Sequence, residues 1–90
     1  MNEASLQRLA DRAKRLADAG HHGDAARAFE ELAGRAGVQR GDVAGQAWTL
    51  ASDAWRRDDR PREAVAAGLA AERFAGLTGD ALAVLLSARA

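Results

Sequence analysis

The sequence predicts an all-α domain, and three observations support that fold class. Of the 90 residues 24 are alanine, the residue with the highest helix propensity. Aromatic residues make up only 4%, and a sheet built on aromatic and β-branched residues is therefore disfavoured. The only proline, Pro61, leaves almost the whole chain free to be helical. The length is that of one domain, spanning residues 1–90.

Two helices separated by a short turn are predicted in the first part of the chain. Between Ser5 and Ala19, apolar residues recur at three- and four-residue steps and form one stripe, which consists of Leu6, Leu9, Ala13, Leu16 and Ala17. Gly20 ends this helix. The next helix runs from Asp24, a natural N-cap, to Ala36, where Gly37 is a natural C-terminal stop. Its apolar face consists of Ala25, Ala28, Phe29, Leu32, Ala33 and Ala36.

A second pair of helices follows the polar connection at residues 38–41. Asp42 is expected to cap a helix that ends at Arg57 or Asp58, with an inner face of Ala44, Ala47, Trp48, Ala51, Ala54 and Trp55. Pro61 suits the first turn of a fourth helix, which we expect to run to about Gly76. Its inward residues are small except at one end, so a neighbouring helix can approach closely: Ala64, Gly68, Ala71, Phe74 and Ala75.

A fifth helix is predicted over about residues 81–89, after the break at Thr78–Asp80. It has almost no polar face, and we expect something to cover it. Because chains of this size have little stability to spare, we expect its leucines to cap the preceding helices on one side and to meet a partner on the other. The simplest partner is the same helix of a second copy in a two-fold dimer, with Leu82, Leu85 and Leu86 at the interface.

The two helix pairs can be superimposed with a shift of 39 residues, which pairs Leu9 with Trp48, Ala13 with Ser52, Leu16 with Trp55 and Ala25 with Ala64. This alternation of large and small residues resembles the tetratricopeptide repeat. The units span about residues 4–37 and 42–77, and residues 80–90 form either a cap or the start of a third unit of a longer repeat protein. The resemblance implies antiparallel hairpins stacked as a short right-handed superhelix of about five helices.

The resemblance has identifiable gaps. Gly20 matches the turn glycine of the family, whereas Asp59 replaces it in the second unit. Gly68 stands where the family prefers an aromatic residue, and Gly37 and Gly76 stand where it prefers a proline. A four- or five-helix bundle without repeat ancestry therefore remains the alternative fold.

The resemblance also implies a partner-binding groove, because the first helices of successive units line a concave surface in this family. The polar residues that lie off the packing stripe on those helices are Gln7, Asp11, Lys14, Asp18, Gln46, Thr49, Asp53, Arg56 and Arg57. Their mixed charges differ from the basic clamp by which some family members hold a terminal carboxylate. The expected partner is another protein or a peptide.

Composition argues against several other classes of function. The 13 basic and 13 acidic residues balance, so nucleic-acid binding is not expected. The chain has no cysteine, which excludes disulfides and thiolate metal sites and fits a cytoplasmic protein. No apolar run approaches the roughly 20 residues of a membrane span. The arginine-rich, alanine-rich composition is typical of a bacterial protein.

Few residues are candidates for chemistry. Ser5, Ser52 and Ser87 lack the context of a nucleophile, so we expect no catalytic residue, no enzyme activity and no cofactor. The adjacent histidines His21 and His22 fit a solvated turn better than a metal site.

Two further features have both a structural and a ligand-binding interpretation. Trp48 and Trp55 are seven residues apart and could line a cleft, but helix packing is the favoured role, and each indole N–H then needs an acceptor or solvent. The charged run at residues 56–63 could hold an anion, but a self-paired turn is favoured.

These observations leave three hypotheses for function. The first is a protein-interaction module that acts as an adaptor or assembly part. The second is a structural, self-assembling helical domain whose groove is filled by its own chain or a neighbour. The third is a small DNA-binding helical protein, whose affinity would fall steeply with salt.

Overall fold

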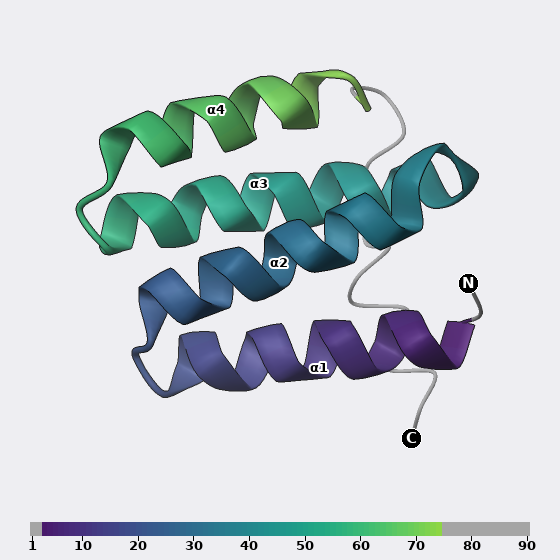
Figure 1. Cartoon of the computed structure of the whole chain (residues 1–90), viewed down its shortest axis with the longest axis horizontal. Helices are drawn as coiled ribbons and strands as arrows, with labels where there is room; N and C mark the ends of the chain where they lie inside the picture. Colours follow the sequence, from purple (N-terminus) through teal and green to yellow (C-terminus); the bar gives the residue numbers. More distant parts are fainter. Residues whose placement is uncertain (1–2, 75–90) are drawn as a thin grey trace.

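A computed structural model describes residues 3–74 as four α-helices and one short 3₁₀ helix. The elements are α1 (Glu3–Asp18), α2 (His22–Ala36), η1 (Gly37–Arg40), α3 (Gly41–Arg57) and α4 (Pro61–Glu72). The helices lie side by side in chain order, with each antiparallel to the next (Figure 1). The all-α prediction is confirmed, and the described residues contain no strand. The predicted helix at 81–89, with Leu82, Leu85 and Leu86, lies outside the described residues.

The predicted ends of the first three helices are close to those observed. Gly20 and Gly37 have φ angles of 86° and 53°, a left-handed conformation that glycine adopts without a steric penalty. α3 ends at Arg57 and α4 begins at Pro61, as predicted. α4 is shorter than predicted: it ends at Glu72 instead of about Gly76, because the next two N–H groups bond to carbonyls only three residues back.

The two predicted N-caps are wrong. α2 begins at His22, because the carbonyl of His21 already accepts the N–H of Ala25 at 2.8 Å. α3 begins at Gly41, because the 3₁₀ helix η1 carries the chain from α2 into α3 without an extended connection. Asp24 and Asp42 therefore lie in the first turns of their helices, where a negative charge is still favourable beside the helix dipole.

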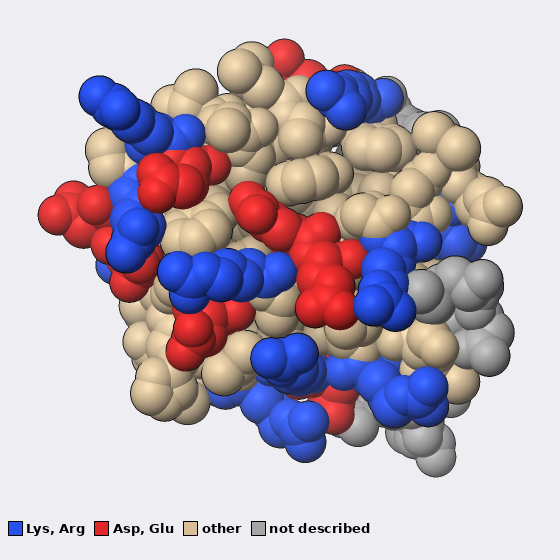
Figure 2. Space-filling model, in the orientation of Figure 1, with Lys and Arg blue, Asp and Glu red and all other residues tan. Residues whose placement is uncertain are grey.

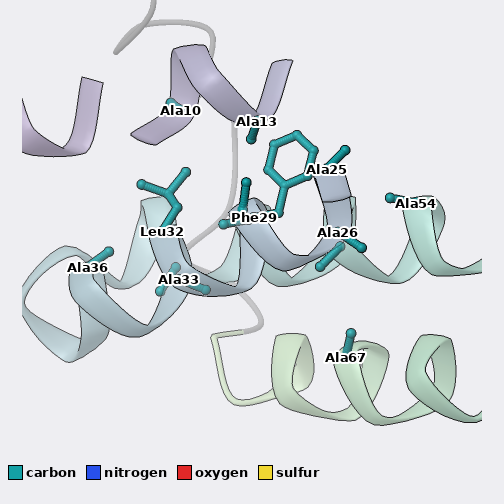
Figure 3. Packing of buried hydrophobic residues seen from close by; sticks show 14 of the residues in the cluster. Ala10, Ala13, Ala25, Ala26, Phe29, Leu32, Ala33, Ala36, Ala54 and Ala67 are labelled. Atoms are coloured by element: carbon teal, nitrogen blue, oxygen red, sulfur yellow. The ribbon is translucent and has the colours of Figure 1, made fainter. Parts of the chain in front are cut away.

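Alanine dominates the core. Thirteen of the 18 buried apolar residues in the described part of the chain are alanine, so neighbouring helices meet across very short side chains. Figure 3 shows the larger Phe29 and Leu32 pointing from α2 toward α1. Every residue of the predicted apolar face of α2 is buried. The prediction missed Ala10, Ala26, Val43 and Ala67, because the buried arc of a packed helix is wider than the one stripe of residues predicted for it.

The two interhelical turns have the same backbone hydrogen bonds, 39 positions apart. In the α1–α2 turn, His21 N–H donates to the carbonyl of Leu16 at 2.9 Å. In the α3–α4 turn, Arg60 N–H donates to the carbonyl of Trp55, also at 2.9 Å. Both contacts are the six-to-one bond of a Schellman motif, which requires a left-handed residue. Gly20 is that residue in the first turn, and Asp59, with φ of 59°, takes its place in the second.

We predict opposite effects for two glycine-to-alanine substitutions. Gly20→Ala should lower the free energy of unfolding by about 1 kcal/mol, because alanine is strained at positive φ. Gly34→Ala should raise it by about 0.5–1 kcal/mol, because Gly34 is an exposed helical residue with open space at its Cβ. Urea unfolding measures both changes.

The second turn provides an independent check of the same conformational argument. Asp59→Gly should raise the free energy of unfolding by roughly 0.5 kcal/mol, because it relieves the left-handed strain at that position. A loss of stability on Asp59→Gly would contradict the equivalence of the two turns.

Candidate functional site

A groove of about 450 Å³ lies between α1 and α3, with α2 below it. α1 and α3 run in the same direction on either side of α2 (Figure 1). Side chains from these two helices form the walls of the groove. The lining residues are Ala10, Lys14, Ala17, Asp18, His22, Phe29, Leu50, Asp53, Ala54 and Arg57. The groove is thus lined by three helices.

The floor of the groove is apolar. Phe29 projects from α2 toward α1 beside Ala13 (Figure 3), and its ring is almost completely buried. Ala10 and Ala17 of α1 and Ala54 of α3 have short side chains, which leave the space between the walls unfilled. Leu50 of α3 completes the apolar surface. Such a surface can accept an apolar side chain from a ligand.

The rim of the groove carries one ion pair on each wall. On α1, Lys14 Nζ is 2.7 Å from Asp18 Oδ2. On α3, Arg57 Nε is 2.9 Å from Asp53 Oδ2. All four side chains are substantially exposed, and exposed ion pairs of this kind contribute at most about 1 kcal/mol. A ligand that offers its own charges can therefore replace these pairs at little cost.

The structure brings together four of the nine predicted groove residues, namely Lys14, Asp18, Asp53 and Arg57. The others, which do not line the groove, are Gln7, Asp11, Gln46, Thr49 and Arg56. The Thr49 hydroxyl donates to the carbonyl of Gly45 at 3.0 Å, and Arg56 pairs with Asp53 at 3.3 Å.

The sequence prediction missed the floor of the groove because it considered only polar residues of the first helices. Phe29 and His22 come from α2, the second helix of its hairpin, which lies between α1 and α3. Leu50 could have been found from the sequence, because it is the one leucine of α3 and lies off the predicted packing stripe.

Trp55 connects α3 to α2 and does not line the groove. It is only 4% exposed, and its indole N–H donates to Glu30 Oε2 at 2.8 Å. The guanidinium groups of Arg27 and Arg60 lie 5.6 and 6.0 Å from its ring, within cation–π distance. Trp48 is half-buried against the core. The packing role predicted for both tryptophans is confirmed, as is the acceptor predicted for Trp55.

The charged run at the α3–α4 turn is self-paired, as predicted. Arg60 lies 3.0 Å from Asp58 and 3.5 Å from Glu63. An open polar hollow of about 310 Å³ separates this turn from the α1–α2 turn, which contains His21 and His22. Within residues 3–74, no three histidine, aspartate or glutamate side chains are grouped in a way that could hold a metal ion.

A second charged cluster joins the beginnings of α1 and α3. Arg40 Nη1 contacts Glu3 Oε2 at 2.7 Å, and Arg40 Nε contacts Asp42 Oδ1 at 3.2 Å. The hydrogen bond from Arg40 lowers the pKa of Asp42, although partial burial acts in the opposite direction. The hydrogen bonds to Asp42 and Glu3 raise the pKa of Arg40 in turn. This cluster links the beginnings of α1 and α3, at the end of these helices away from the groove.

The visible surface combines both signs of charge. Figure 2 shows acidic and basic side chains side by side over the face of the molecule, without a large region of one sign. Among the helices described, none is long and apolar enough to cross a membrane. No protein-family model matches the sequence, and no curated protein or solved structure matches it significantly. The groove is therefore the basis for any functional proposal.

We predict that Glu30→Ala lowers the free energy of unfolding by about 1–3 kcal/mol, because it leaves the buried indole N–H of Trp55 without its acceptor. Glu30→Gln should lower the free energy of unfolding much less, because the amide oxygen can accept the same hydrogen bond. Thermal unfolding followed by circular dichroism measures both effects.

The neighbouring Glu31 provides a matched control for this prediction. It pairs with Arg35 at 3.4 Å on the exposed side of α2, so Glu31→Ala should change stability by less than about 0.5 kcal/mol. Equal losses of stability for Glu30→Ala and Glu31→Ala would show that the hydrogen bond to Trp55 contributes no more to stability than an exposed ion pair.

Proposed function

We propose that the protein is a non-catalytic protein-interaction module, an adaptor or assembly part, whose groove binds a peptide segment of another protein. The observation that carries this proposal is the groove itself, in which an apolar floor around Phe29 and Leu50 is flanked by weakly held ion pairs. A ligand could bury an apolar side chain on the floor and exchange charges with the rim. The proposal includes no cofactor, no metal, no membrane and no nucleic acid.

The proposed architecture is a pair of divergent tetratricopeptide-like units in a right-handed superhelix. Three features support it: the shift of 39 residues, the identical hydrogen bonds of the two turns, and left-handed residues at the equivalent positions Gly20 and Asp59. The groove lies between the first helices of the two units, as the resemblance implies. On this proposal the chain acts as a homo-oligomer or within a larger repeat protein in a bacterial cytoplasm.

The mixed rim charges define the kind of peptide proposed. Each wall presents a cation and an anion close together, so a ligand with neighbouring charges of both signs would pair with each wall. A purely acidic peptide would meet Asp18 and Asp53 as well as Lys14 and Arg57, and like charges placed together oppose binding. The preferred ligand is therefore an apolar residue flanked by residues of opposite charge.

Lys14→Glu combined with Arg57→Glu should weaken peptide binding at least about tenfold, because the rim then carries four negative charges. The probe is a set of peptides selected from a random library on the unmodified chain, and fluorescence anisotropy measures the dissociation constant.

The matched control for the groove variant is Arg15→Glu combined with Arg35→Glu. These changes alter net charge equally and also remove one exposed ion pair each, but neither residue lines the groove. Unchanged binding by the groove variant, or equal weakening by both variants, would show that the groove does not bind the peptide. Loss of self-association alone would support the structural hypothesis, and retardation of duplex DNA at low salt would support the DNA-binding one.

The proposed dimer makes a separate prediction. If Leu82, Leu85 and Leu86 form a two-fold interface, light scattering should give twice the monomer mass at micromolar concentration. Leu85→Asp should restore the monomer, because a buried carboxylate without a partner destabilises the interface. A stable monomer of the unmodified chain would refute the dimer and leave the groove proposal intact.

A further inference from the structure

The outer face of α4 exposes two large apolar side chains. Val65 is 62% exposed and Leu69 is 60% exposed, and they lie four residues apart on one side of the helix. The surface over α4 in Figure 2 is mostly uncharged. Within residues 3–74 no helix follows α4, and neighbouring aliphatic side chains exposed on such a face indicate a surface that another element covers.

The equivalent face of α2 is covered by the helix that follows it in the chain. A shift of 39 residues places Val65 at the position of Ala26 and Leu69 at the position of Glu30. Ala26 is fully buried, and Glu30 accepts the indole hydrogen bond from Trp55 of α3. α2 thus uses these positions in contact with the helix that follows it. By the same geometry, Val65 and Leu69 face the place of a helix that follows α4.

The opposite end of the molecule differs in chemistry. Buried positions of α3, at Ala47, Ala51 and Ala54, correspond to positions 8, 12 and 15 of α1. Those positions hold Arg8, Arg12 and Arg15, and all three are exposed. A second copy that stacked its α1 on α4 would therefore place three arginines against Val65 and Leu69. Burying three positive charges against aliphatic side chains is unfavourable, which argues against a head-to-tail stack.

The sequence predicts a suitable helix at the required spacing, over residues 81–89. α2 is followed by Gly37, and α3 begins soon afterwards at Gly41–Asp42. In the sequence, Gly79–Asp80 follows Gly76 at a similar spacing. Residues 81–89 then include Leu82, Leu85 and Leu86. We propose that residues 80–90 cover the outer face of α4, with these leucines against Val65 and Leu69. This inference does not depend on what the groove binds. It is an alternative to the two-fold interface proposed above, because residues 82, 85 and 86 share one helix face, which cannot pack on α4 and on a second copy at once.

Engineered cysteines test the proposal in the full chain, which has no cysteine of its own. Leu69→Cys is combined in turn with Leu82→Cys, Leu85→Cys and Leu86→Cys, and each pair is equilibrated in a glutathione redox buffer. The matched control series replaces Leu69→Cys with Ala66→Cys, an exposed α4 residue that lies about 100° from Val65 and about 60° from Leu69 around the helix axis. Any flexible tail would reach both positions about equally.

At least one Leu69→Cys pair should form an intramolecular disulfide with an effective concentration about tenfold above that of its Ala66→Cys control. Equal values in the two series would overturn the proposal. Disulfides that join two chains at micromolar protein would also overturn it, and would assign the α4 face to a second copy. Circular dichroism of the reduced variants shows that each remains folded.

Discussion

The close approach of neighbouring helices across alanine faces is the constraint on which this structure depends. A core made of alanine gains little from each buried side chain, so its stability comes from many contacts between backbones and short side chains. Ala25 and Ala44 are both fully buried, so replacing either with a larger residue would force the packed helices apart. The larger residues Phe29, Leu32 and Trp55 then fill the gaps that alanines leave.

The groove follows from the same constraint. Because alanines on α1 and α3 leave the space above α2 unfilled, a ring from α2 becomes the floor of an open surface. A core with larger residues at Ala10, Ala17 and Ala54 would have filled this space with the protein's own atoms. The surface that we propose as a binding site is thus a by-product of packing with small side chains.

The sequence alone predicted the fold class, three helix ends and the buried face of α2, because glycine punctuation and apolar periodicity are local signals. It did not predict where α2 and α3 begin. Aspartate is a favourable N-cap residue. However, the backbone at His21 already starts α2, and η1 leads directly into α3, so both aspartates lie inside their helices. The path that the chain must take between packed helices therefore has more influence on where a helix begins than the preference of a residue for the N-cap position.

The site was predicted only in part for a related reason. Lys14, Asp18, Asp53 and Arg57 were found because polar residues off an apolar stripe must face outward, which is again a local argument. The contribution of Phe29 depends on α2 lying between α1 and α3, and the link between Glu30 and Trp55 spans 25 positions. Neither can be deduced from periodicity within one helix.

The order of the helices has a consequence for how the chain folds. Each helix packs mainly on its neighbours in sequence, and the link from Glu3 to Arg40 is one of the few contacts that spans two elements. Such short-range topology has low contact order, which is associated with fast folding. In a linear array of this kind, opening proceeds inward from the ends, so amide hydrogens of α2 and α3 should exchange with solvent last.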